Sequence, residues 1–90
     1  MYWSRILTEI AGERERQTKI SGTVRHDLPL WITVLGEEFG KVCRDILRSR
    51  EDGVLPVQMS VLLRHARMEL IQLAAVAVAT IEHLDELAKS

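Results

Sequence analysis

The sequence contains one cysteine and little net charge. Cys43 has no second cysteine with which to form an internal disulfide, and no cysteine or histidine stands near it at metal-ligand spacing. We therefore expect it to pack as a small apolar side chain. A single cysteine that cannot form an internal disulfide also suits a reducing cytoplasm. A formal net charge of -1 removes the attraction on which non-specific binding to nucleic acid depends, so nucleic acid is not an expected partner.

Long apolar runs are also absent. The most apolar window, residues 70–81, contains Gln72 and Thr80, and it is shorter than the roughly 20 residues that span a bilayer. The first five residues lack the basic lead and the apolar core of a signal peptide. Membrane association is not expected, and the predicted location is cytoplasmic.

The composition is that of an ordinary globular domain, with 90 residues of which 47% are apolar and 28% are charged. Repeats are absent and the β-branched residues follow helical periodicity, so residues 1–90 are predicted to form a single all-α domain. A chain of this size buries only about 60 to 65% of its unfolded surface. We expect a small bundle of three main helices, completed by dimerisation or tetramerisation.

The first helix is predicted from apolar residues at three-to-four-residue spacing. These are Tyr2, Trp3, Ile6, Leu7 and Ile10. The helix is expected to continue through the charged run 13–17, whose side chains pair along a solvated face. Gly22 marks its end, and residues 20–28 are expected to form a loop.

The second helix is predicted over residues 30–49. Asp27 can accept hydrogen bonds from exposed backbone N–H groups, and Pro29 needs no N–H donor in the first turn. The apolar stripe of this helix comprises Trp31, Val34, Leu35, Val42, Ile46 and Leu47. Glu38 lies on that stripe between Leu35 and Val42, so its side chain is expected to point toward the core or a cleft.

The third helix is predicted over residues 58–88, after a short connection at 51–57. Gly53 ends the second helix and Pro56 delays the start of the third, which makes the two helices antiparallel neighbours. Residues 70–81 are apolar on every side, which predicts contact with both the core and another subunit.

Carboxylates embedded in these two apolar patterns indicate a site for a cation or a charged ligand. Glu38 and Lys41 share a face of the second helix, and Glu69 and Gln72 share a face of the third. Two such pairs facing each other across antiparallel helices could surround one cation. Magnesium, which takes a few carboxylates together with waters and phosphate oxygens, suits such a site and supports phosphoryl transfer.

Three runs of the sequence resemble the MazG-like nucleotide pyrophosphohydrolases of the all-α NTP pyrophosphatase superfamily. They are ERERQ at 13–17, WITVLGEEFG at 31–40 and ELIQLAAVAVA at 69–79, within a resemblance that extends over residues 13–84. The resemblance implies hydrolysis of a nucleoside triphosphate to a monophosphate and pyrophosphate. It also implies Mg²⁺, or else Mn²⁺, as the cofactor and a homo-oligomeric assembly.

The family's motifs, Glu-Glu-x-x-Glu and Glu-x-x-Asp, assign roles to particular residues. Glu37, Glu38 and Glu69 match, and Gln72 stands where the motif has aspartate. The resemblance therefore implies these four residues as metal ligands, with Glu38 and Glu69 as the catalytic carboxylates.

Lys41 departs from the motif, because it stands where the family has its third glutamate. An ammonium group cannot coordinate Mg²⁺, and like charges about 4 Å apart repel by roughly 4 kcal/mol at an effective dielectric constant near 20. Two alternatives are open. Lys41 either forms an ion pair with Glu37, Glu38 or Asp45 and replaces the metal, or contacts a substrate phosphate as a point charge.

Other candidate substrate contacts are weaker. Trp31 could stack on a nucleobase, although its spacing is also typical of the core. Arg16 and Lys19 could reach phosphates from the first helix, and so could His26 from the following loop. His65 and His83 are expected on helix surfaces, and no histidine pair has metal-ligand spacing.

Three hypotheses about function therefore remain. The first is a metal-dependent nucleotide pyrophosphohydrolase. The second is a catalytically degenerate relative that binds a nucleotide or a protein. The third is a small helical scaffold, which Glu38 and Glu69 on separate surfaces would favour.

Overall fold

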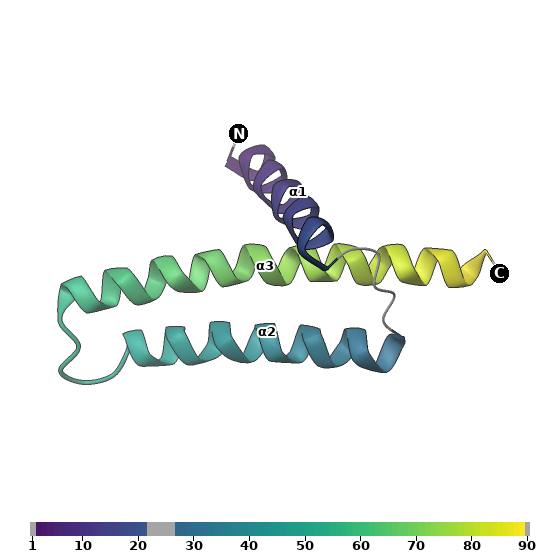
Figure 1. The fold of residues 1–90 in the computed structure, drawn as a ribbon. Coiled ribbons are helices and arrows are strands. Elements are labelled where there is room, and N and C mark those ends of the chain that lie inside the picture. The colour runs from purple at the N-terminus through teal and green to yellow at the C-terminus, as the bar shows by residue number, and fades with distance from the viewer. Residues whose placement is uncertain (1, 22–26, 90) are drawn as a thin grey trace.

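The computed structural model describes residues 2–21 and 27–89, which form three helices (Figure 1). They are α1 (Tyr2–Ser21), α2 (Leu28–Ser49) and α3 (Pro56–Ala88). α2 and α3 lie side by side and antiparallel, and α1 crosses α3 on the side away from α2. Within the described ranges no strand occurs, so the predicted all-α fold is confirmed.

The start of α2 follows from its capping residue. An Oδ1 oxygen of Asp27 accepts a hydrogen bond from the backbone N–H of Leu30 at 3.0 Å, and Pro29 occupies the first turn. The helix begins at Leu28, earlier than predicted, because Asp27 is itself the N-cap. At the other end of the predicted loop, Ile20 still belongs to α1, while Gly22 lies outside the described residues.

The connection between α2 and α3 is shorter than predicted. Gly53 takes a positive φ of 83°, which glycine adopts without steric cost. α3 then begins at Pro56, because the first helical residue needs no N–H donor. The side-chain oxygen of Gln58 accepts from the Leu55 N–H at 3.0 Å and helps to cap this end. The helix therefore begins at Pro56 itself, two residues before the predicted start near residue 58.

α2 and α3 pack along a seam in which the inward residues alternate spacings of four and three. On α2 these residues are Trp31, Leu35, Glu38, Val42, Asp45 and Ser49. On α3 they are Leu62, Ala66, Glu69, Leu73, Val76 and Thr80. All are buried or half-buried, and the spacing is typical of two helices that stay in contact over their length. The seam therefore contains carboxylates as well as apolar side chains.

The predicted apolar stripe of α2 is correct in its first half and wrong in its second. Leu47 is 67% exposed and Ile46 is 40% exposed. Asp45 and Ser49 take the inward positions instead, since they continue the four-and-three spacing from Val42. The sequence pattern predicted that Ile46 and Leu47 point inward, whereas the helix register places the carboxylate of Asp45 in that position.

Polar contacts connect α1 to α3. The guanidinium of Arg67 donates to both carboxylate oxygens of Glu9, at 3.1 and 2.6 Å. Farther along α1, Nε2 of Gln17 donates to the backbone carbonyl of Gln72 at 3.3 Å. The apolar stripe at the start of α1 stays uncovered: Trp3, Ile6 and Leu7 are all exposed. The side chain of Tyr2 lies outside the described residues.

The apolar middle of α3 has both covered and uncovered sides. Val76 and Thr80 are buried in the seam with α2, and Ala75 and Ala79 are also buried. Leu70, Val78 and Ile81 are exposed, which leaves room for the predicted second subunit. Within the described helices, none has an apolar stretch long enough to cross a membrane.

Candidate functional site

Three polar side chains converge in the seam between α2 and α3. His65 and Glu69 lie one turn apart on α3, and Asp45 faces them from α2. Nδ1 of His65 is 2.6 Å from Oδ2 of Asp45 and 3.3 Å from Oε1 of Glu69. We call these three residues the seam triad.

The two carboxylates of the triad are buried and its imidazole is not. The side chains of Asp45 and Glu69 are 6% and 5% exposed, whereas that of His65 is 50% exposed. Burial, which penalises the charged form, raises the pKa of Glu69 above its ordinary value. The nearby charge of Asp45 raises this pKa further, while those of His65 and Arg44 oppose the shift.

Two carboxylate oxygens in the seam have no hydrogen-bond partner among the described residues. They are Oε2 of Glu38 and Oε2 of Glu69, and both atoms are fully buried. A buried polar atom without a partner loses its hydration without compensation, at a cost of about 1–3 kcal/mol or more when charged. Such atoms are unusual in folded proteins, and a bound cation is one way to compensate them.

Glu38 points into the seam, as predicted, and forms an ion pair with Lys41. Nζ of Lys41 is 3.3 Å from Oε1 of Glu38, one turn away on the same helix. The predicted ion pair with Glu38 is therefore present, while replacement of a metal ion by Lys41 stays a prediction. Glu37, the preceding residue, is exposed on another side of α2.

Of the predicted metal ligands, only Glu69 belongs to a cluster of possible ligands in the described residues. Across residues 2–21 and 27–89, one group of three acidic, histidine or cysteine side chains has ligand atoms all within 4.8 Å of one another. That group is the seam triad, which shares only Glu69 with the predicted ligand set. Gln72 is half-buried, and its backbone carbonyl accepts from Gln17. Metal binding by Glu37, Glu38, Glu69 and Gln72 stays a prediction.

The predicted substrate contacts lie in different places. Trp31 is half-buried at the start of the α2–α3 seam, as its spacing also allowed. Arg16 forms a bidentate ion pair with Glu13, at 2.7 and 2.6 Å, and Lys19 is exposed in the last turn of α1. His26 lies outside the described residues.

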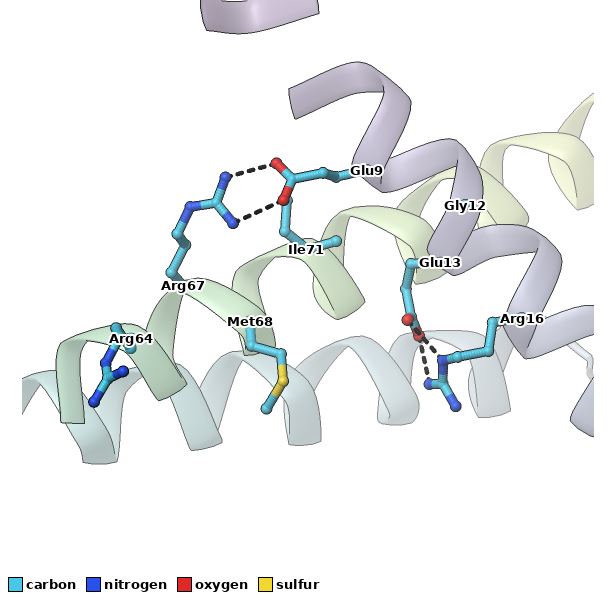
Figure 2. Close-up of a pocket in the computed structure, with 8 residues that line it drawn as sticks. All are labelled: Glu9, Gly12, Glu13, Arg16, Arg64, Arg67, Met68 and Ile71. Atoms are coloured by element: carbon cyan, nitrogen blue, oxygen red, sulfur yellow. Dashed lines mark hydrogen bonds and ion pairs between the residues drawn. The ribbon is translucent and has the colours of Figure 1, made fainter. Parts of the chain in front are cut away.

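A cavity of about 610 Å³ lies between α1 and α3 (Figure 2). Its lining consists of Glu9, Gly12, Glu13, Arg16, Arg64, Arg67, Met68 and Ile71. Hydrogen bonds from Arg67 and Arg16 lower the pKa values of Glu9 and Glu13, so both carboxylates stay ionised at neutral pH. The cavity opens on a different side of α3 from Glu69, which faces Asp45 on α2.

Sequence reasoning did not assign Asp45 and His65 to a site. The signal was present in part, because His65 and Glu69 stand four residues apart and must share a helix face. Asp45 follows Glu38 by seven residues and so also faces the seam. What the pattern could not supply is the register that brings Asp45 opposite His65.

Comparison with protein-family models, with curated proteins and with solved structures found no match to this chain.

Proposed function

We propose that the protein is a divalent-metal-dependent nucleotide pyrophosphohydrolase, which converts a nucleoside triphosphate into a monophosphate and pyrophosphate. One observation carries the proposal: Glu38 and Glu69, on adjacent helices, each have a buried carboxylate oxygen without a hydrogen-bond partner in the described part of the chain. A divalent cation with bound phosphates would compensate such oxygens. The likeness of residues 31–40 and 69–79 to MazG-like enzymes supplies the reaction type.

The donor chemistry of these residues fits magnesium or manganese. Glu38 and Glu69 offer hard carboxylate oxygens, and Glu37 and Gln72 are the further ligands in this proposal. When bound, such an ion neutralises phosphate charge and lowers the pKa of a coordinated water. The protein's own part is to keep the two carboxylates inside the seam, where water does not compete for them.

Lys41 is the proposed phosphate contact nearest to this site. Its side chain is half-exposed, and its ammonium group lies 3.3 Å from Oε1 of Glu38. A flexible ammonium group can pair with a phosphate oxygen while staying close to the carboxylate. In this proposal Lys41 adds positive charge where the related enzymes have a third glutamate.

Arg16 requires a second protomer to take part. The cavity that it lines has a volume within the range of about 300–1,000 Å³ that small ligands occupy. Because that cavity and the seam open on different sides of α3, one nucleotide reaches both Arg16 and Glu38 only if they come from different chains. Homo-oligomerisation is therefore part of this proposal.

The test measures pyrophosphate release from a panel of canonical and modified nucleoside triphosphates with Mg²⁺ or Mn²⁺. We expect Glu38→Gln and Glu69→Gln to lower the rate by about ten- to hundredfold or more, because each removes a negative ligand without changing its shape. Glu51→Gln, at an exposed carboxylate in the connection, is the matched control and should leave the rate unchanged. Failure of every nucleotide to release pyrophosphate would refute the proposal.

A second candidate function is favoured by the ion pair between Lys41 and Glu38. In this alternative the ammonium group replaces the metal, and the protein binds nucleotides or a protein partner without hydrolysis. Calorimetric titration with Mg²⁺ separates the two candidates. Absence of Mg²⁺ binding in the natural protein, with binding in Lys41→Glu, supports the second; Mg²⁺ binding in the natural protein supports the first.

A further inference from the structure

The seam triad places two carboxylates around a single imidazole nitrogen. Nδ1 of His65 is within 3.3 Å of an oxygen from both Asp45 and Glu69. One ring nitrogen carries at most one proton, so it satisfies one of these acceptors fully and not both. The second carboxylate then requires either a proton of its own or another cationic partner.

Burial makes this requirement stronger. The side chains of Asp45 and Glu69 are at least nine-tenths buried, so each carboxylate needs a proton or a cation to compensate its charge. Arg44 acts on Glu69 more weakly than burial and Asp45 do. Oε2 of Glu69 also has no hydrogen-bond partner in the described chain. The triad thus combines two buried carboxylates with a buried ligand atom that accepts no hydrogen bond from the described residues.

The spacing of the three ligand atoms suits one metal ion. All of them lie within 4.8 Å of one another. Ligands at about 2.0–2.2 Å from an ion stand roughly 3.3–3.6 Å apart in tetrahedral geometry and roughly 2.8–3.1 Å apart at adjacent octahedral positions. The 3.3 Å separation of His65 and Glu69 fits the tetrahedral value, and the 2.6 Å separation of His65 and Asp45 needs a small increase. Rotation of the half-exposed imidazole supplies that increase.

We propose that Asp45, His65 and Glu69 bind one divalent transition-metal ion, of the class of Mn²⁺, Co²⁺ or Zn²⁺. The imidazole nitrogen and one oxygen from each carboxylate are the ligands. Nitrogen ligation favours these ions over Mg²⁺, which prefers oxygen donors. Because His65 is half-exposed, positions facing solvent remain available for water or for an oxygen of a small ligand.

The site is tested by calorimetric titration of the full chain with CoCl₂ and ZnCl₂, after removal of trace metal. We expect one Co²⁺ or Zn²⁺ ion per chain, and visible d–d absorption when the ion is Co²⁺. His65→Ala, at a half-exposed position, should weaken binding at least about tenfold. Asp45→Asn should do the same, and circular dichroism checks that this buried substitution leaves the helices intact.

A matched control variant makes the outcome decisive. His83→Ala removes another histidine of α3, half-buried outside the triad, and should leave binding unchanged. Absence of binding by the natural protein, or binding that survives His65→Ala, overturns the proposal and leaves the triad as a hydrogen-bonded cluster only.

This inference does not rest on the proposed hydrolysis. Glu69 belongs to both sites, so the discriminating variants are His65→Ala for the triad and Glu38→Gln for hydrolysis. If Glu38→Gln abolishes pyrophosphate release but keeps Co²⁺ binding, the two sites are distinct; if His65→Ala abolishes Co²⁺ binding in a protein that releases no pyrophosphate, the triad holds and the hydrolysis proposal fails.

Discussion

The carboxylate of Glu69 occupies a position in the α2–α3 seam where an apolar side chain is usual. Its Oε1 faces His65, and its Oε2 is buried without a hydrogen-bond partner in the described chain. Burial of Oε2 without a partner disfavours the ionised form, whereas His65 favours it. A residue that lowers stability when unpartnered is often retained for function, which is why both proposals include Glu69.

The raised pKa of Glu69 predicts a specific dependence of stability on pH. The folded chain holds the carboxyl proton more tightly than the unfolded chain does, so the free energy of unfolding falls as the pH rises from about 4.5 through the folded pKa. Glu69→Gln resembles the protonated form and removes this decline. Urea unfolding of both proteins between pH 4 and 7, with a chelator present, measures the difference.

We expect the natural protein to lose stability relative to Glu69→Gln as the pH rises. Asp52→Asn, at an exposed carboxylate in the connection, is the control and should follow the natural protein. A constant difference between natural protein and Glu69→Gln over this range would contradict the prediction.

The N-terminus of α2 depends on one capping side chain. Asp27 accepts from the Leu30 N–H, and loss of this bond leaves a backbone donor without its partner. We expect Asp27→Ala to lower the free energy of unfolding by about 1 kcal/mol. Asp27→Asn keeps a capping oxygen and should cost much less. Equal losses for the two variants in urea unfolding would show that the cap contributes little.

α1 is a helix, as predicted, but three of the apolar residues predicted for its inward stripe are exposed. Its apolar spacing indicated a stripe against the core, yet Trp3, Ile6 and Leu7 are exposed. The polar contacts with α3 come from Glu9 through Arg67, from Arg14 through Glu82, and from Gln17. Charged and amide side chains decide where α1 lies, because they meet partners on α3 that periodicity does not reveal.

The whole chain exposes more surface than a compact monomer. Its accessible surface is 6853 Å², against about 5,400 Å² for a compact protein of 10.3 kDa. Its radius of gyration of 15.4 Å also exceeds the value of about 12 Å for a compact domain of 90 residues. The excess is larger than the roughly 800 Å² that one partner contributes to a standard interface.

We expect a second copy of the chain to bind along an exposed apolar stripe of α3. It consists of Leu63, Leu70, Ala74, Ala77, Ile81 and Leu84, which are exposed or half-buried at helical spacing. Leu70→Lys should convert the oligomer to monomer in light-scattering chromatography, because the ammonium group would be buried in the interface. Leu55→Lys, in the connection, should leave the mass unchanged. A natural protein that is monomeric at high concentration would contradict this prediction.

Sequence patterning predicted part of the candidate site. Glu38 points inward because its helical phase relative to Leu35 and Val42 allows no other side, and Lys41 pairs with it because residues three apart are neighbours on a helix. The same reasoning failed at Leu47, which is exposed although it is apolar. Phase along one helix is local, whereas burial depends on which residues the partner helix covers.

The sequence by itself determined three helices, the cap at Asp27, the turn at Gly53 and the antiparallel pairing of α2 with α3. These features follow from backbone chemistry and from residues that are close together in the sequence, so they can be predicted without knowing the tertiary contacts. Only the tertiary structure decided that Asp45 meets His65 and Glu69 and that α1 leaves α2 uncontacted in the described chain. The physical reason is register: the offset between two helices is set by packing summed along their whole seam, and no single pair of residues encodes it.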